Sequence, residues 1–499
     1  MASPSTPCYT LPPVQTRHAV LRLAAIAVLG VLLGACDRPP PVPRKAHLAR
    51  LPVKAVPGSW SVSTDLAHVA FQVHGTDGIH IVRDGVPGRD WQTVSTRSFA
   101  PNTDRIFYWA RASDGTTALV AADEVVPVGM SRHEYLTFDP SGAHWAVVAA
   151  APVAAGDVGD PDARIVVVGD GIVRGRHRDA SVPAWSHDGT HLAWVAVEPA
   201  EGEGSQMRLL VDGAVRQAAD MTPGPCIPPV QTASEGPGLP ADARALFLSD
   251  GRAVALMRDG DGWGVFRDGE RLGHFGATVP VSAGGPVLTV ESDACHTAAT
   301  IVTGSLVVAA DAPVVAWWER MPGAEDRWRV MIDGAPADDV TCLRPWEAQP
   351  PVLSADGRSW AYPCFTRVDV SGQAVDVVTR HGRYGPHVEI YGVVLSDDGR
   401  RVGYGATDAA GGDFTLYADG VAYPHRYYSI WRPRFDPSGR HLAWEGQHTL
   451  GARGLLVLDG RDLASFDDLL DGPTFLDPDH VSWVVRRNRR LTRLTFPLS

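Results

Sequence analysis

The chain has 499 residues, of which 45 are lysine or arginine and 57 are aspartate or glutamate. Its formal net charge is −12, and −14 once Arg17 and Arg22 are removed with a leader. A charge of this sign argues against nucleic acid or anionic lipid head groups as the main partner. The remaining body of about 460 residues is long enough to bury a large core.

The first 35 residues predict an export signal. They carry two arginines and no acid, followed by an apolar run over residues 23–33 that ends in small residues. This run is too short to span a bilayer comfortably, so we interpret residues 1–35 as a secretory signal peptide. Its end, Leu33-Gly34-Ala35-Cys36, resembles a bacterial lipobox, and the resemblance implies that Cys36 receives a diacylglycerol and becomes the first residue after cleavage. The alternative is an ordinary signal peptide with a chance cysteine.

Residues 36–57 are predicted to be the lipidated cysteine and a tether. Asp37 resembles the signal that keeps lipoproteins of enteric bacteria on the inner membrane, so we favour that membrane over the outer one. The prolines between residues 39 and 43 favour an extended polyproline spacer. We therefore expect a lipid-anchored protein of the bacterial cell envelope that faces the periplasm.

From residue 58 onward the chain repeats one pattern: an aromatic residue or leucine, a short turn of Asp or Ser with Gly, and an alternating apolar stretch. The turns 138–142 and 185–189 are two copies. The anchor residues align as Trp60, Phe99, Phe138, Trp185, Phe247, Val314, Leu353, Leu395, Phe435 and Phe475. Most separations lie near 40 residues, which suits a blade of four short strands. The longer intervals between 185 and 314 indicate loop insertions or one degraded blade.

Each repeat carries a second signature, an aliphatic run that ends in Asp-Gly. Copies end at Asp84-Gly85, Asp212-Gly213, Asp268-Gly269, Asp333-Gly334, Asp419-Gly420 and Asp459-Gly460. Asp-Gly between apolar runs predicts a type I′ hairpin. Two hairpin turns in 40 residues predict a four-stranded antiparallel meander. A helical solenoid is excluded, because no repeat carries a ten-residue run with helical spacing.

We therefore predict an all-β fold: a β-propeller of about 8–10 four-stranded antiparallel blades over residues 58–499. One closed ring is favoured over two tandem propellers that meet within residues 216–245. The last repeat, over residues 475–496, supplies only about two strands. N-terminal residues such as 48–56 are predicted to complete that blade and close the ring.

The pattern resembles the TolB-type, WD-like propeller repeat over most of residues 58–496. That consensus runs aromatic-Ser-Pro-Asp-Gly and then an aliphatic-Ala-aromatic strand. The resemblance implies recognition of a partner through loops at one face or at the mouth of the central channel. Sialidase Asp boxes are excluded, because they place a residue between Asp and Gly, whereas Asp188-Gly189 and Asp356-Gly357 are adjacent.

Four cysteines remain after lipidation of Cys36 and loss of Cys8 with the leader. An even number in an exported protein favours disulfides, and four cysteines allow three pairings. We expect Cys342 to pair with Cys364, because they end strand regions of neighbouring blades. Cys226 and Cys295 both lie in irregular insertions, and we expect them to form the other bond.

The remaining candidates for chemistry have simpler structural explanations. Residues 259–262 and 157–162 resemble the start of a calcium loop, but a hairpin and a solvated loop are favoured. Trp317, Trp318 and Trp328 could stack on a sugar or peptide, and core packing is favoured. The basic cluster 486–490 predicts a solvated hairpin tip, with docking of an acidic partner as the alternative.

No catalytic, metal or cofactor motif is present in the sequence, which lacks Gly-x-Ser-x-Gly, His-Glu-x-x-His and nucleotide-binding fingerprints. We therefore expect a non-enzymatic, membrane-tethered propeller that binds an envelope protein or small ligand at its face or channel and binds no nucleic acid. The alternative is an envelope lyase or hydrolase whose site is assembled in the channel. A cluster of polar side chains there with perturbed pKa values would favour the enzyme.

Overall fold

The computed structural model describes residues 42–126, 132–150, 165–200, 205–221, 243–279, 300–302, 304–323, 327–343, 349–369 and 372–498. The chain divides into two units, Met1–Val42 and Pro43–Ser499, and every strand belongs to the second. The described residues form strands, turns and bends without any helix, so this part of the chain is all-β. Within these ranges, no helix has the length and apolar character that crossing a membrane requires.

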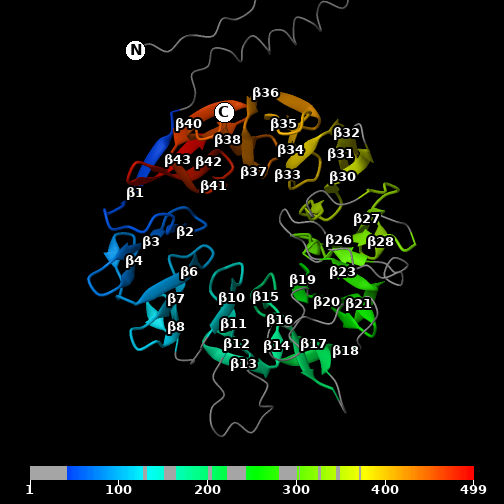
Figure 1. Cartoon of the computed structure of the whole chain (residues 1–499), viewed down its shortest axis with the longest axis horizontal. Coiled ribbons are helices and arrows are strands. Elements are labelled where there is room, and N and C mark those ends of the chain that lie inside the picture. Colours follow the sequence, from blue (N-terminus) through cyan, green and yellow to red (C-terminus); the bar gives the residue numbers. More distant parts are fainter. Residues whose placement is uncertain are drawn as a thin grey trace, which may run out of the picture. The chain divides into compact units, whose positions relative to one another are not determined.

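The described strands form ten sheets that are arranged in one ring, a β-propeller (Figure 1). Eight sheets have four strands, and the fourth and sixth blades carry one or two additional short strands. All pairs are antiparallel except that of β23 with β24. The prediction of one ring is therefore confirmed, and the number of blades is ten.

The first five blades follow the chain in order. Their strands are β2 (Ser61–Val62), β3 (Val69–His74), β4 (Ile79–Arg83) and β5 (Val86–Pro87); β6 (Thr93–Phe99), β7 (Ile106–Arg111), β8 (Thr117–Ala121) and β9 (Glu124–Val125); β10 (Arg132–Phe138), β11 (Trp145–Ala150), β12 (Ile165–Gly169) and β13 (Ile172–His177); β14 (Asp179–Ala180), β15 (Ala184–Trp185), β16 (Leu192–Pro199), β17 (Ser205–Val211) and β18 (Ala214–Asp220); and β19 (Arg244–Phe247), β20 (Ala253–Asp259), β21 (Gly262–Arg267) and β22 (Glu270–Phe275).

Blades six to ten continue in the same way. Their strands are β23 (Ala277–Val279), β24 (Thr300–Val302), β25 (Val307–Val308), β26 (Val315–Arg320), β27 (Trp328–Ile332) and β28 (Ala335–Pro336); β29 (Val352–Leu353), β30 (Trp360–Asp369), β31 (Gly372–Thr379) and β32 (Gly382–His387); β33 (Glu389–Leu395), β34 (Val402–Thr407), β35 (Phe414–Ala418) and β36 (Val421–Tyr427); β37 (Ser429–Phe435), β38 (Leu442–Gln447), β39 (Gly454–Leu458) and β40 (Arg461–Phe466); and β41 (Asp468–Asp477), β42 (His480–Arg487) and β43 (Arg490–Pro497), joined by β1 (Arg44–Arg50).

The two ends of the described chain close the ring. β1 pairs antiparallel with β43, from Arg44 opposite Thr495 to Arg50 opposite Arg490, and β2 contacts β41. Closure by an N-terminal strand is confirmed, but two details differ from the prediction. The closing strand is 44–50 rather than 48–56, so it lies within the range assigned to the tether. The C-terminal segment supplies three strands rather than two, because β41 begins ahead of the anchor Phe475.

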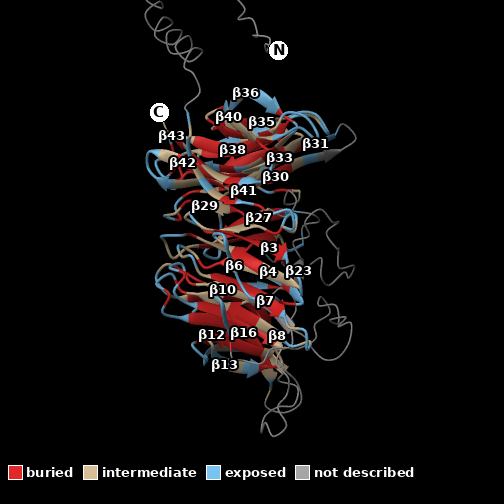
Figure 2. Ribbon diagram, turned by 90° about the vertical axis from the view of Figure 1, so that its left-hand side faces the viewer, coloured by how far each residue is buried: buried red, intermediate tan, exposed pale blue. Residues whose placement is uncertain are grey.

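The hydrophobic core lies between neighbouring blades. Side chains of the second and third strands interleave with those of the next blade, as where Phe107 and Trp109 of β7 pack with Trp145 of β11. Figure 2 shows these strands as buried, whereas exposed residues lie in the connections between strands and on fourth strands such as β36. Burial on both faces explains why the second strands are continuous apolar runs.

The Asp-Gly signature bonds neighbouring strands within a blade, as the ninth blade illustrates. Asp459 has φ +48° and Gly460 has φ +80°, the two positive values that a type I′ turn needs. The Asp459 N–H donates to the carbonyl of Leu442, and its carboxylate accepts from the Leu442 N–H (2.9 Å) and from the His441 ring (2.6 Å). The predicted hairpins are confirmed, and the aspartate also bonds the third strand to the start of the second.

The first turns of several blades share one hydrogen-bond network, which occurs in two versions. Ser186 donates to the Asp188 carboxylate (2.6 Å) and accepts from the backbone N–H of His191 (2.9 Å). In turn 139–142 the roles are exchanged, because Asp139 takes the first position and Ser141 the third. The first turns of neighbouring blades are in contact. A Cβ added at Gly189, in turn 186–189, would lie 2.7 Å from the carboxylate of Asp139 in the preceding blade. Serine and aspartate are therefore interchangeable here for structural reasons.

Two of the predicted anchors were wrong. Val62 and Val308 occupy the position that Trp185 holds in its blade, each paired with the first residue of the second strand, whereas Trp60 and Val314 lie outside the strands. The sequence pattern does not reveal the turn after Val62, because Leu66 (φ +56°) stands where the fourth blade has Gly189. The long intervals between 185 and 314 contain no additional sheet within the described residues.

Candidate functional site

A concavity of about 450 Å³ lies on the inner strands of four blades that the ring closure brings together. Its lining comes from β2, β6, β37 and β41, as residues 61–62, 97–99, 432–434 and 470–474. These strands lie on the side of their sheets that faces the centre of the ring (Figure 1). The lining contains three arginines, Arg97, Arg432 and Arg434, and one carboxylate, Asp471. The concavity is therefore predominantly cationic.

Arg432 occupies a bulge that neighbouring blades build with glycine. The register of β37 against β38 shifts after Trp431, and Arg432 has φ +48°. The same shift in β33 places Gly392 there (φ +63°), and in β41 it places Gly472 (φ +113°). A left-handed conformation costs a non-glycine residue about 1–2 kcal/mol. Bulges redirect side chains and are frequent beside functional sites, and here the bulge combines an unfavourable backbone conformation with a side chain that lines the concavity.

The other two arginines differ in burial. Arg97 is half-buried, its Nη2 donates to the carbonyl of Gly58 (3.3 Å), and burial lowers the pKa of its guanidinium. Its Nε is buried without a hydrogen-bond partner in the described part of the protein. Arg434 is exposed. Neither Arg432 nor Arg434 is paired with a carboxylate within 4.0 Å in the described ranges, so both are available to an anion.

Glu445 of β38 lies behind this wall. Its side chain is 5 % exposed, and its Oε1 has no hydrogen-bond partner among the described atoms. Burial raises the pKa of Glu445 to about 8; the positive charge of Arg432 opposes the rise and the negative charge of Asp471 adds to it. Both of these charges belong to residues that line the concavity. At neutral pH the carboxyl is therefore mostly protonated, and it does not neutralise Arg432.

The arrangement suits binding of an anion. Guanidinium groups hold carboxylates through paired N–H donors and do not exchange protons near neutral pH. Hydroxyl groups of Ser61, Ser98 and Thr474 add hydrogen-bonding capacity to the same wall. Glu445 is not among the lining residues, so its proton is not presented to a ligand in the concavity. No group of three or more metal-ligating side chains occurs within the described ranges.

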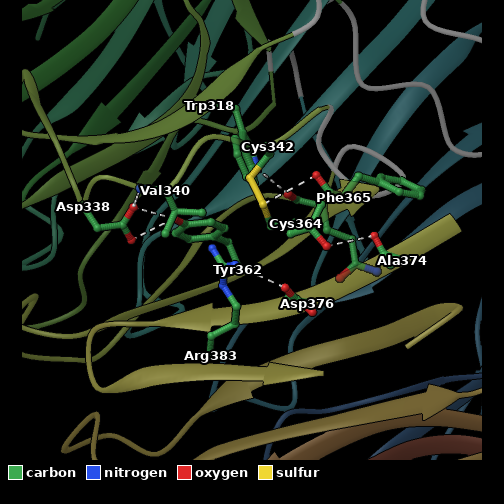
Figure 3. The surroundings of a disulfide bond; sticks show 12 residues. Trp318, Asp338, Val340, Cys342, Tyr362, Cys364, Phe365, Ala374, Asp376 and Arg383 are labelled. Atoms are coloured by element: carbon green, nitrogen blue, oxygen red, sulfur yellow. Dashed lines mark hydrogen bonds and ion pairs between the residues drawn. A yellow bond between two sulfur atoms is a disulfide. The ribbon is translucent and has the colours of Figure 1, made fainter. Parts of the chain in front are cut away.

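The predicted bond between Cys342 and Cys364 is present, with a Cα–Cα distance of 5.3 Å. It joins the end of the sixth blade to β30 of the seventh, in a buried region beside Trp318 and Tyr362 (Figure 3). The Tyr362 hydroxyl donates to the Asp338 carboxylate (2.8 Å), so a hydrogen bond supports the same junction. Cys36, Cys226 and Cys295 lie outside the described residues.

The structure also places the residues that sequence reasoning treated as structural. Trp317, Trp318 and Trp328 are buried, which confirms core packing. Segment 259–262 is a hairpin, and its Asp259 carboxylate accepts from the Arg271 guanidinium (2.7 Å). Segment 157–162 lies outside the described residues. The basic cluster 486–490 is the turn between β42 and β43, as predicted.

Sequence reasoning did not identify Arg97, Arg432, Arg434 or Glu445. Arg97 lies on β6 and the other two arginines lie on β37, and only closure of the ring brings Arg97 near them. One local signal was available. Alignment of Ile390-Tyr391-Gly392 with Ile430-Trp431-Arg432 places an arginine at a position where the preceding repeat has glycine.

Comparisons with known proteins concern the fold. No family model and no curated protein matches the chain. Among solved structures, the β-propeller domain of the Trilobed protease from Pyrococcus furiosus matches with 9% identity and a TM-score of 0.28, over 74% of this chain and 97% of that one. TolB from Acinetobacter baumannii matches with 14% identity and a TM-score of 0.23, over 74% and 70% of the two chains.

A prolyl endopeptidase matches with 12% identity and a TM-score of 0.31 over 71% of this chain, which spans about half (54%) of the peptidase chain. Identities and TM-scores this low carry no inference about ligand or activity. The propeller is assigned from the strand order and register of the chain itself.

Proposed function

We propose that this chain is an envelope lipoprotein whose propeller binds acidic segments of a partner protein at the concavity lined by Arg97, Arg432 and Arg434, without catalysing a reaction. The observation that carries the proposal is Arg432. It holds a left-handed conformation that costs stability, in a bulge where the two neighbouring blades have glycine. Its guanidinium lies in a cationic wall, and the buried Glu445 behind that wall is mostly protonated at neutral pH.

The cell-envelope location is supported by the sequence. A basic start, an apolar run, the end Leu33-Gly34-Ala35-Cys36 and a proline-rich spacer each fit a lipoprotein. A single acyl chain binds membranes only marginally, so firm attachment needs the multiple acylation that a lipobox implies. Asp37 favours the inner membrane over the outer.

The alternative, an envelope lyase or hydrolase, needs an acid or base that touches the substrate. The carboxyl with the raised pKa nearest the concavity is Glu445, which does not line it. The cationic lining favours binding over catalysis.

The ligand proposal is tested with the Arg432→Gly variant, which restores the residue of the neighbouring blades. We expect binding of hexaglutamate to weaken at least tenfold, while the melting temperature at pH 6 stays equal or rises, because glycine tolerates the bulge conformation. Hexaglutamine is the uncharged probe, and Arg440→Gln, at an exposed arginine that directly follows turn 436–439, is the control for charge. Equal hexaglutamate affinity in wild type and Arg432→Gly, or equal affinity for both peptides, contradicts the proposal.

Lipidation is tested separately with Cys36→Ser. We expect the wild type to incorporate a labelled fatty acid and to fractionate with membranes, and the variant to lose the label. Absence of label in the wild type would show that Cys36 is not a lipidation site, whatever the propeller binds.

A further inference from the structure

A second cationic surface lies at the outer edge of the tenth blade. Lys45 and Arg50 of β1 and Arg487, Arg489 and Arg490 of the β42–β43 hairpin line one concavity of about 470 Å³. We call these five residues the basic edge. The two segments that form it come from opposite ends of the described chain and meet because β1 completes the last blade.

The charges of the basic edge are not neutralised by the fold. None of the five cations has a carboxylate within 4.0 Å in the described ranges, whereas the adjacent Arg486 is paired with Asp468. Arg487 and Arg489 use Nε to bond the backbone carbonyls of Ser465 (2.7 Å) and Leu51 (3.1 Å). These bonds hold both guanidinium groups in place and leave their charges uncompensated.

The strand register also places like charges together. Arg50 lies directly opposite Arg490 in the β1–β43 pair, and all residues of the basic edge except Arg487 are exposed. Like charges in opposed positions destabilise a sheet. An anion in the concavity would remove that repulsion.

The covalent chain connects this edge to the proposed anchor. Seven residues, 37–43, lie between Cys36 and Arg44, the first residue of β1. Whatever their conformation, the eight residue steps from Cys36 to Arg44 extend at most roughly 29 Å. If Cys36 carries the lipid, the start of β1 therefore stays within about this distance of the bilayer surface.

We propose that the basic edge binds anionic lipid head groups and thereby orients the propeller on the membrane to which Cys36 tethers it. The tether step rests on the lipidation proposed above. The overall negative charge does not oppose this, because screening confines a surface charge to about 8 Å at physiological ionic strength. Cations held near an anionic membrane each strengthen the attachment.

The test uses the unlipidated chain from residue 37, which retains every strand of the propeller because all ten sheets lie within residues 44–497. Co-sedimentation is measured with vesicles of phosphatidylcholine alone and with 30% phosphatidylglycerol. We expect binding to the anionic vesicles only, and weakening as salt is raised. The variant R487Q/R489Q/R490Q should bind roughly a hundredfold more weakly, as expected for three cations at an anionic surface.

The matched control is R358Q/R400Q/R440Q, which removes three exposed arginines that each follow the first turn of a blade. It should bind as the wild type does. Equal binding to both kinds of vesicle, or unchanged binding by R487Q/R489Q/R490Q, overturns the proposal. Binding of hexaglutamate by the basic edge without binding to anionic vesicles would overturn it in favour of an acidic protein partner. None of these outcomes depends on fatty-acid labelling of Cys36, so head-group binding and lipidation are tested independently, and only the tether step fails if Cys36 carries no lipid.

Discussion

Replacement of Glu445 by glutamine should stabilise the protein at alkaline pH and leave it nearly unchanged at acidic pH. In the native state burial raises the pKa of Glu445 from its ordinary value of 4.5 to about 8. Between these two values the unfolded chain has released its proton and the native protein has kept it. The free energy of unfolding therefore falls as pH rises from 4.5 to about 8 and levels off above that. Glutamine, which does not ionise, removes this loss.

The difference between the pKa of Glu445 in the unfolded chain, 4.5, and in the native protein, about 8, sets the size of the effect. At pH values above 8 it lowers the free energy of unfolding of the wild type by roughly 5 kcal/mol. An unfolding entropy of about 2.1 cal/mol/K per residue, over about 460 residues, converts this to an increase of up to about 5 °C in melting temperature. The assay is differential scanning fluorimetry of Glu445→Gln and wild type from pH 5 to pH 9.

The matched control is Glu319→Gln. Glu319 is buried to a similar extent, but its carboxylate accepts from the Arg329 guanidinium (2.7 Å). Loss of that ion pair should lower the melting temperature without a gain at high pH. If the difference between Glu445→Gln and wild type is the same at pH 5 and pH 9, the native carboxyl does not retain its proton and our account of the wall behind the concavity is wrong.

Two further substitutions test the packing of the ring. Gly142→Ala should destabilise the protein by about 1–3 kcal/mol more than Gly251→Ala. Both glycines have positive φ, but only at Gly142 would the new Cβ meet a backbone oxygen, that of Pro101 at 2.0 Å. Equal chemical-denaturation midpoints for the two variants would show that the first turns do not pack against each other. Cys342→Ser should lower the free energy of unfolding by roughly 3 kcal/mol, the chain-entropy value for a bridge across 22 residues. In urea denaturation the variant should unfold at the same concentration as the reduced wild type and at a lower concentration than the oxidised wild type.

The fold was predictable because its signals are local. An Asp-Gly turn with positive φ at both residues needs no distant contact, and Asp459-Gly460 adopts it as the sequence indicates. The period near 40 follows from the length of four strands. The predicted anchor of the first blade was wrong because its turn departs from the repeated pattern: Leu66 adopts the left-handed conformation there without being glycine. The closing strand is 44–50 rather than the predicted 48–56, because the repeated pattern does not mark the boundaries of β41 in the last blade.

The candidate site was not predictable, because closure of the ring creates it. Arg97 and Arg432 are 335 positions apart in the sequence and become neighbours only when the first and last blades join. The charge state of Glu445 depends on burial between blades, which composition does not reveal. The sequence could only indicate that a channel site, if present, would draw single residues from several blades.

Equivalent positions in neighbouring blades can be compared with Arg432. At the bulge of the inner strand, three consecutive blades have a register shift and a residue with positive φ, which is +63° at Gly392, +48° at Arg432 and +113° at Gly472. Gly392 and Gly472 adopt a positive φ without strain, and Arg432 adopts it with strain. A residue that departs from its own repeat towards a less stable choice is not explained by the fold. Its charge lies in a wall shared with two other arginines, and the anion binding that we propose there would account for both its conformation and its position.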